Sequence, residues 1–262
     1  MKIVFEKFNG VGNDFVMIDN RDMNFPAGNA GLIQMLCDRH FGIGADGLIL
    51  IENMEGHDFK MVYFNSDGNP SSMCGNGGRC SVGFAFSKNI CGSESKFVAI
   101  DGTHNAFILQ EGLVKLSMNT DSQIEIAGDD YIIQTGSPHL VRFVNGLKDL
   151  NVFEIGNQIR NSERFIKEGI NSNFVEIAND EIKMRTYERG VENETLSCGT
   201  GTVAVALAVS EKLNYSVGTH SMHIEAIGGH LKVHFNKNEN GVYDNVWLEG
   251  PISKVFHGEI II

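Results

Sequence analysis

The chain has 262 residues, of which 42% are hydrophobic, and its formal net charge is −12. This length suits two domains that each bury a core, whereas the negative charge and the lack of a basic run argue against nucleic-acid binding. The longest apolar run, residues 203–209, is far too short to cross a bilayer, and the first residues contain no signal-peptide core.

Hydrophobic periodicity and glycine breaks predict alternating strands and helices in the first half of the chain. The strands are expected at residues 2–8, 15–18, 48–51, 59–64, 97–100, 106–109 and 113–118, and the helices at 30–40 and 76–87. Gln110, Glu111 and Gly112 predict a hairpin turn between the last two strands. Residues 119–128 are polar and non-periodic, so we expect a domain boundary there.

The second half repeats this alternation. Its strands are expected at residues 131–134, 140–144, 174–177, 182–187, 222–226, 231–235, 242–248 and 252–262, and its helices at 153–165 and 200–213. The sequence therefore predicts an α/β protein of the α+β type with two domains. One domain comprises residues 1–119, completed by a returning strand at 251–262, and the other comprises 120–250.

An internal duplication relates the two halves. Cys74 and Cys198 are 124 positions apart (198 − 74), as are Tyr63 and Tyr187 (187 − 63) and the glycines at 12 and 136 (136 − 12). Two units are too few for a solenoid. We expect two copies of one α/β unit, each bringing one cysteine to a cleft between them.

Each of these two cysteines follows a strand-like segment and opens a helix-like one. Backbone N–H groups at a helix N-terminus favour negative charge, and such a place can lower a thiol pKa from about 8.5 to roughly 3.5–7.5. Two such thiols suggest an acid–base pair that removes a proton from one face of a carbon and returns it to the other, which inverts a stereocentre. The alternative is a pair of ordinary buried cysteines beside glycine turns.

Five cysteines make an odd count, and we interpret them as reduced thiols in the cytoplasm. No Cys-x-x-Cys occurs and no spacing resembles a zinc site. The sequence also lacks a lysine motif for a pyridoxal cofactor, so a route without cofactor or metal is the simpler expectation.

Four motifs together resemble the diaminopimelate epimerase family over nearly the whole chain. They are Gly12-Asn13-Asp14-Phe15, Met73-Cys74-Gly75-Asn76-Gly77-Gly78-Arg79-Cys80, Gly136-Ser137-Pro138-His139, and Glu188-Arg189-Gly190 with Glu194-Thr195-Leu196-Ser197-Cys198-Gly199-Thr200-Gly201. The resemblance implies two pseudo-symmetric domains, each a mixed sheet wrapped round a central buried helix. It also implies a homodimer that interconverts LL- and meso-2,6-diaminopimelate without a cofactor, in lysine and peptidoglycan precursor synthesis.

The resemblance also implies roles for particular residues. Cys74 and Cys198 are the expected catalytic groups, and His139 and Glu188 are expected to tune the thiols. The residues expected to bind substrate are Asn13, Asn65, Gly75, Asn76, Asn171, Glu188, Arg189, Gly199 and Thr200.

Several of these residues also have an ordinary structural interpretation. Asn65 and Asn171 would suit turns or caps, Glu188 and Arg189 would suit a surface ion pair worth under about 1 kcal/mol, and His139 would suit a loop histidine.

Two positions depart from the commonest family pattern. Gly47 stands where many members have Gln, and Ser137 stands where many have Asn. Gly47 cannot donate from a side chain, whereas Ser137 can, so substrate affinity is less closely implied than the thiol chemistry.

Three other functions remain open at this point. A proline racemase-type isomerase would share the architecture, but that type usually has His in its first Cys-Gly-x-Gly, and Asn76 and Arg79 favour the epimerase. A non-catalytic ligand- or metal-binding module would tolerate loss of either cysteine. A disulfide regulatory protein would pair Cys74 with Cys198, and we expect such oxidation to inactivate an epimerase reversibly.

Overall fold

A computed structural model describes residues 1–110, 112–120 and 123–262. The chain divides into two compact units, unit 1 with residues 1–116 and 250–262 and unit 2 with residues 117–249. Glu111 of the expected hairpin turn and residues 121–122 of the expected boundary lie outside the described residues.

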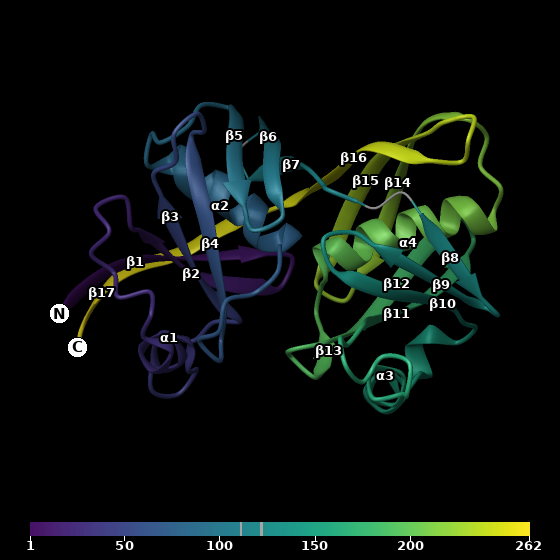
Figure 1. Ribbon diagram of the computed structural model, residues 1–262, viewed down its shortest axis with the longest axis horizontal. Coiled ribbons are helices and arrows are strands. Elements are labelled where there is room, and N and C mark those ends of the chain that lie inside the picture. The colour runs from purple at the N-terminus through teal and green to yellow at the C-terminus, as the bar shows by residue number, and fades with distance from the viewer. Residues whose placement is uncertain (111, 121–122) are drawn as a thin grey trace. The chain divides into compact units, whose positions relative to one another are not determined.

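The strands of unit 1 form a mixed sheet. Its strands follow one another in the order β17 (Ser253–Ile261), β1 (Lys2–Gly10), β2 (Asn13–Asp19), β3 (Gly47–Glu52), β4 (Phe59–Asn65), β5 (Glu94–Ala99), β6 (Gly102–Gln110) and β7 (Leu113–Ser117). The β2–β3 and β4–β5 pairs are parallel and the others antiparallel. The two ends of the chain lie side by side, because β17 pairs with β1 (Figure 1).

Helix α2 (Gly75–Ser87) forms the centre of unit 1, and nearly all of its side chains are buried. A helix that is apolar around most of its circumference needs cover on several sides, and the strands of unit 1 supply it (Figure 1). Helix α1 (Ala30–Cys37) belongs to a second apolar cluster, with Val16, Leu48 and Leu50. Side chains alternate along a strand, so β2 and β3 bury their two faces against different helices.

Unit 2 repeats the arrangement. Its strands are β8 (Ile124–Ala127), β9 (Asp130–Gln134), β10 (Pro138–Phe143), β11 (Asn171–Ala178), β12 (Glu181–Glu188), β13 (Asn193–Thr195), β14 (Gly218–Ala226), β15 (Gly229–Lys237) and β16 (Tyr243–Pro251). The β10–β11 and β12–β14 pairs are parallel, and the remaining neighbours are antiparallel. This is the pairing pattern of unit 1 with one short strand, β13, added.

Helix α4 (Gly199–Lys212) is the central helix of unit 2, and every residue from 199 to 210 is buried. It begins 124 positions after α2 (199 − 75), so the spacing read from the sequence relates the two central helices without a net insertion. Helix α3 (Val152–Arg160) packs on the opposite side of the sheet with Phe174 and Tyr187.

The mixed α/β fold is confirmed, but several expected elements have different limits. Helix α1 ends at Cys37 rather than at residue 40, because the Asp38 carboxylate accepts the backbone N–H groups of His40 and Phe41 and turns the chain. Helix α3 ends at Arg160 rather than at 165.

Two short strands were not expected. Strand β8 lies within the polar stretch taken as a connection, and β13 lies in the loop before Cys198. Both are four residues or shorter, so neither carries a periodic signal of its own and each exists because a longer neighbour offers pairing. Among the helices of the described ranges, none combines the length and apolar character that a membrane span requires.

Candidate active site

Cys74 occupies the N-cap position of α2 and has extended backbone angles. The backbone N–H of Gly77 donates to its Sγ at 3.4 Å, and its thiol lies 3.5 Å from Oδ1 of Asn13. The thiol is half-buried. It therefore meets a helix N-terminus, which favours the thiolate, and an amide oxygen, which accepts a hydrogen bond from the thiol form.

A charged cluster holds Asn13 in this orientation. Asn13 Nδ2 donates to Asp46 Oδ2 at 2.7 Å, which turns Oδ1 toward Cys74. Arg39 bridges Asp46 and Asp14 at 2.8 Å each, and Lys7 pairs with Asp14 at 2.8 Å. Burial alone would raise the pKa of Asp14, but the hydrogen bonds and charges of Arg39 and Lys7 outweigh it, so that this pKa is lowered.

The face of the sheet that packs against α2 explains why position 47 is a glycine. A Cβ at Gly77 of α2 would touch Ile49 and Met61, so the odd-numbered side chains of β3 and β4 face the helix. A Cβ at Gly47 would lie 2.5 Å from Cε2 of Tyr63 and 2.5 Å from the backbone O of Phe64. The Tyr63 ring therefore occupies the space in which a side chain at 47 would begin, next to Asn65.

Behind Cys74 lies a fully buried arginine. Arg79 has no exposed surface, and its guanidinium donates to Asn76 Oδ1 at 2.8 Å and approaches the Gly75 carbonyl at 3.4 Å. Asn76 Nδ2 in turn lies 3.4 Å from Asn13 Oδ1. Burial lowers the pKa of Arg79 to about 10, so the group stays charged at neutral pH.

In unit 2, Cys198 caps α4 in the same conformation as Cys74 caps α2. Its Sγ lies 3.5 Å from the hydroxyl of Thr200. A Cβ at Gly201 would sit 2.5 Å from Oδ1 of Asn173, so the glycine lets the first turn of α4 approach β11. The first turn, the thiol and the polar face of β11 are thereby brought together.

A neutral histidine stands behind Thr200. Asn173 Nδ2 donates to the Leu140 carbonyl at 3.0 Å and to His139 Nδ1 at 3.2 Å. With Nδ1 an acceptor, the proton of the neutral ring is on Nε2, which donates to Thr200 Oγ1 at 2.8 Å. The amide nitrogen of Asn171 lies 3.4 Å from Nε2 and directs its hydrogens to Ser137 Oγ and the Pro138 carbonyl instead. The Thr200 hydroxyl hydrogen is then left to point at Cys198. Burial, helped by the charge of Arg189, lowers the pKa of His139 to about 3.

The remaining predicted residues of unit 2 gather at the same sheet end. Asn171 donates to Ser137 Oγ at 3.0 Å and accepts the backbone N–H of Arg189 at 3.0 Å. The Arg189 guanidinium reaches Ser137 Oγ at 3.3 Å, and the Glu188 carboxylate accepts the Thr195 hydroxyl at 2.9 Å. Asn171 and Ser137 are buried. Their hydrogen bonds therefore fix both the backbone and the guanidinium of Arg189.

The structure thus gathers the predicted residues into two groups. In unit 1, Asn13, Asn76 and Cys74 share contacts, and Asn65 and Gly47 pair on adjacent strands. In unit 2, Cys198, Thr200 and His139 form one hydrogen-bonded set. Asn171, Ser137 and Arg189 form a second set beside it, with Asn171 Nδ2 3.4 Å from His139 Nε2.

No sequence motif indicated the supporting roles of Asp46, Arg79 and Asn173. Asn173 left a signal, because it is polar and two positions after Asn171, and therefore on the same face of the strand.

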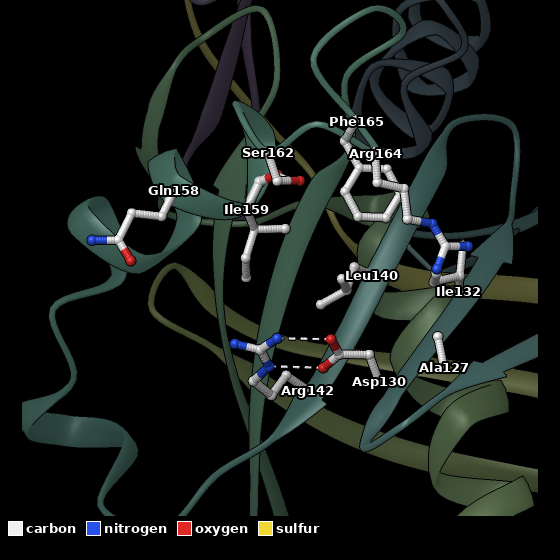
Figure 2. Close-up of a pocket in the computed structure, with 10 residues that line it drawn as sticks. All are labelled: Ala127, Asp130, Ile132, Leu140, Arg142, Gln158, Ile159, Ser162, Arg164 and Phe165. Atoms are coloured by element: carbon white, nitrogen blue, oxygen red, sulfur yellow. Dashed lines mark hydrogen bonds and ion pairs between the residues drawn. The ribbon is translucent and has the colours of Figure 1, made fainter.

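A separate pocket of about 340 Å³ lies in unit 2, lined by residues of β9, β10 and α3 and by Arg164 (Figure 2). Leu140 and Arg142 point into it from β10, and they alternate with His139, which faces α4. The pocket is therefore on the other face of the sheet from Cys198. Its Arg142 is paired with Asp130 at 2.7 Å, as the dashed lines of Figure 2 show.

The other cysteines do not resemble the two helix caps. Burial raises the pKa of Cys37 to about 12 and raises the pKa of Cys80 further. None of the five cysteines, all of which are described, is part of a disulfide bond. Within the described part of the chain, no three His, Cys, Asp or Glu side chains gather as ligands of a metal ion would.

Solved structures define the class of fold. The chain superposes over its whole length on a phenazine biosynthesis protein of the PhzF family from Bacillus anthracis, covering 100% of both chains with a TM-score of 0.77 and 13% identity. It also matches a probable proline racemase from Agrobacterium radiobacter, covering 99% of this chain and 93% of that one, with a TM-score of 0.71 and 13% identity. At these identities the likeness concerns the fold, which is the two-unit fold shared by these proteins.

Sequence relatives identify the family within that fold. The diaminopimelate epimerase family model matches residues 5–123 and 131–253. A diaminopimelate epimerase from Flavobacterium psychrophilum is 48% identical over 97% of this chain and 98% of its own length. One from Chlorobaculum tepidum is 42% identical over 97% and 99%. The chain belongs to the diaminopimelate epimerase family.

Proposed function

We propose that this protein interconverts LL- and meso-2,6-diaminopimelate, with Cys74 and Cys198 as the two acid–base groups. One cysteine, as thiolate, takes the proton from the α-carbon, and the other, as thiol, delivers its proton to the opposite face. The carbon is inverted and the two thiols have exchanged states, so no proton is gained or lost overall. General acid–base catalysis of this kind contributes about 10²–10⁴-fold for each group.

The observation that carries the proposal is the repeated helix cap. Each of the two units places one cysteine at the N-terminus of its central helix, in a chain that belongs to this family. The first-turn amides of Gly75, Asn76, Gly199 and Thr200 are suited to the negative charge that develops on the substrate carboxylate as the α-proton leaves, because they are oriented before the reaction begins.

Substrate recognition is assigned to the polar ends of the two sheets. Asn13 and Asn65 in unit 1, with Asn171, Glu188 and Arg189 in unit 2, offer amide, carboxylate and guanidinium groups to the amino and carboxylate groups of the substrate. The Arg189 fork suits a carboxylate. His139, neutral and bonded to Thr200, positions the Cys198 side of the pair, and Glu188 tunes the thiols by its charge.

We also propose that the reaction needs no cofactor, that the enzyme is a cytoplasmic homodimer, and that it serves lysine and peptidoglycan precursor synthesis. The thiol pair is chemically sufficient for proton removal and return. Free cysteines suit a reducing compartment, and exposed apolar side chains of β17 such as Val255 and Phe256 suit a contact with a second copy.

The test is deuterium incorporation from heavy water into LL-diaminopimelate, followed by NMR with reduced protein. We expect exchange with inversion in the wild type, and loss of inversion by at least about a hundredfold in both Cys74→Ala and Cys198→Ala. Cys91→Ala is the matched control and should retain activity. Exchange on proline but not on diaminopimelate would change the substrate, and exchange on no amino acid would refute the epimerase.

A further inference from the structure

Among the described residues, Arg79 is the largest side chain that is completely buried, and it lacks the usual partner of a buried charge. Its guanidinium contacts an amide oxygen and a carbonyl oxygen, and its Nε has no hydrogen-bond partner. Among the ion pairs of the described residues, none includes Arg79. A buried charge without compensation is costly, so such an arginine requires a reason.

The acidic groups of the elements around α2 are already paired. Lys88 and Lys254 pair with Glu6 of β1, Lys7 and Arg39 with Asp14 of β2, and Arg39 also with Asp46. Arg21 pairs with Asp19 of β2 and Lys60 with Glu52 of β3, and Asp101 beside β6 is hydrogen-bonded to His104. The ionisable groups that act on the charge of Arg79 are two thiols, Cys80 and Cys74. Burial raises the pKa of Cys80 so far that it stays a thiol. Cys74 is therefore the group that can supply the missing negative charge.

The structure assigns to Arg79 the role of a positioning residue that supplies the fixed positive charge under Cys74 and so makes its thiolate accessible. This deepens the proposed function and rests on it for its catalytic meaning. A two-thiol mechanism requires Cys74 to exist in both states. Asn13 Oδ1, held by Asp46, accepts a hydrogen bond from the thiol form, and Arg79 offsets that preference.

The guanidinium is held at the first turn of α2. It contacts residues 75 and 76, the two that follow Cys74, and through Asn76 it connects to Asn13. In unit 2 the position equivalent to Arg79 is Val203 (79 + 124), which is also fully buried. The charge is therefore not a general need of the fold, since the matching helix is built without it. In unit 2 the neutral hydrogen bonds of His139 and Thr200 take its place.

The test is the pH dependence of alkylation of each cysteine by iodoacetamide, followed for separate peptides by mass spectrometry. In the wild type we expect the midpoint for Cys74 to lie below the ordinary value of about 8.5. In Arg79→Met we expect the rate at Cys74 near pH 6.5 to fall at least about tenfold, which corresponds to one unit in the midpoint. The limiting rate at high pH and the profile of Cys198 should stay the same.

Two further variants separate charge from hydrogen bonding and from general damage. Arg79→Gln keeps a donor for Asn76 but removes the charge, and it should behave like Arg79→Met. Ser81→Ala removes a buried hydroxyl from the same helix and should leave Cys74 unchanged.

The proposal is overturned if Arg79→Met leaves the Cys74 profile unchanged, or if Arg79→Gln retains the wild-type profile. If neither variant folds, a wild-type midpoint for Cys74 at or above about 8.5 overturns it, and one below that value supports it. Alkylation requires no turnover, so failure of the deuterium experiment would remove the epimerase and leave the assignment of Arg79 intact.

Discussion

The two units place equivalent cysteines at equivalent helix caps, yet they support them by different means. Around Cys74 the supporting groups are charged, namely Arg79 beneath it and the cluster of Asp46, Arg39, Asp14 and Lys7 that holds Asn13. Around Cys198 the groups that continue the hydrogen-bond chain from the thiol, Thr200, His139 and Asn173, are neutral. The comparison shows that the two copies of the fold share the helix terminus and the thiol position, whereas the groups that surround the thiol differ between them.

The difference follows from where each site gets its polar groups. In unit 1 the sheet face next to the thiol is mostly apolar, with Phe15, Ile49 and Met61. The polar support therefore comes from Lys7 and Asp14 near the ends of β1 and β2, from Arg39 and Asp46 in the segment between α1 and β3, and from Arg79 of α2. The equivalent positions 139 (15 + 124) and 173 (49 + 124) in unit 2 are His and Asn. Both side chains are fully buried and hydrogen-bonded to each other, so unit 2 has polar neutral groups on the sheet face where unit 1 has apolar ones.

Acidification should separate the two units most strongly. His139 has a folded pKa of about 3 and an ordinary value of 6.5, so between these values the unfolded chain binds the extra proton. Stability is then lost as pH falls below about 6.5, by about 1.4 kcal/mol per pH unit. The pKa of Asp14 is lowered by folding, so its contribution is present above its ordinary value of 3.8 and is lost below it.

Hydrogen-exchange protection of α4 and α2, compared at pH 7, 5 and 3.5, measures this separation. Unit 2 should lose protection between pH 7 and 5, and unit 1 only below about pH 4. The exposed His257 supplies a matched control, since His257→Gln should not alter the profile. Equal loss in both units at pH 5 would contradict the neutral assignment of His139.

Removing the amide behind His139 should have the next largest effect. Asn173→Leu leaves His139 Nδ1 and the Thr186 hydroxyl without their buried partner. We expect a loss of about 3 kcal/mol in the free energy of unfolding, at the upper end for an unsatisfied buried group. Urea titration measures it, and Asn240→Ala on the exposed turn should change stability by less than about 0.5 kcal/mol. A similar small loss for both variants would show that the hydrogen bonds of Asn173 to His139 and Thr186 do not stabilise the fold.

Filling the glycine of unit 1 should cost somewhat less. In Gly47→Ala the new methyl group would meet the Tyr63 ring and the Phe64 carbonyl at 2.5 Å each. We expect a destabilisation of about 2 kcal/mol, typical of an overpacked site. Gly28→Ala is the matched control, because a Cβ there meets nothing within 4 Å. If Gly47→Ala and Gly28→Ala have the same melting temperature, the Tyr63 ring does not occupy the space next to position 47.

Much of the architecture could be predicted from local patterns. The central helices were placed within one residue at each end, because long apolar segments after a capping cysteine leave few other options. The spacing of 124 residues between Cys74 and Cys198 indicated the duplication before any fold was known. The helices α1 and α3 were predicted too long, because side-chain hydrogen bonds near Asp38 and Asn161 end them where periodicity alone does not.

The support of each thiol was decided only by tertiary contacts. Arg79 is close to Cys74 in the sequence. That no carboxylate pairs with its guanidinium, however, is decided by distant parts of the chain, because other cations already pair with the acidic side chains of the surrounding strands. The lack of space for a side chain at position 47 likewise depends on the ring of Tyr63, sixteen residues away (63 − 47). Residue types and spacing record the thiols and the helices that they cap, because these are local, whereas compensation of charge and filling of space involve residues that meet only in the folded chain.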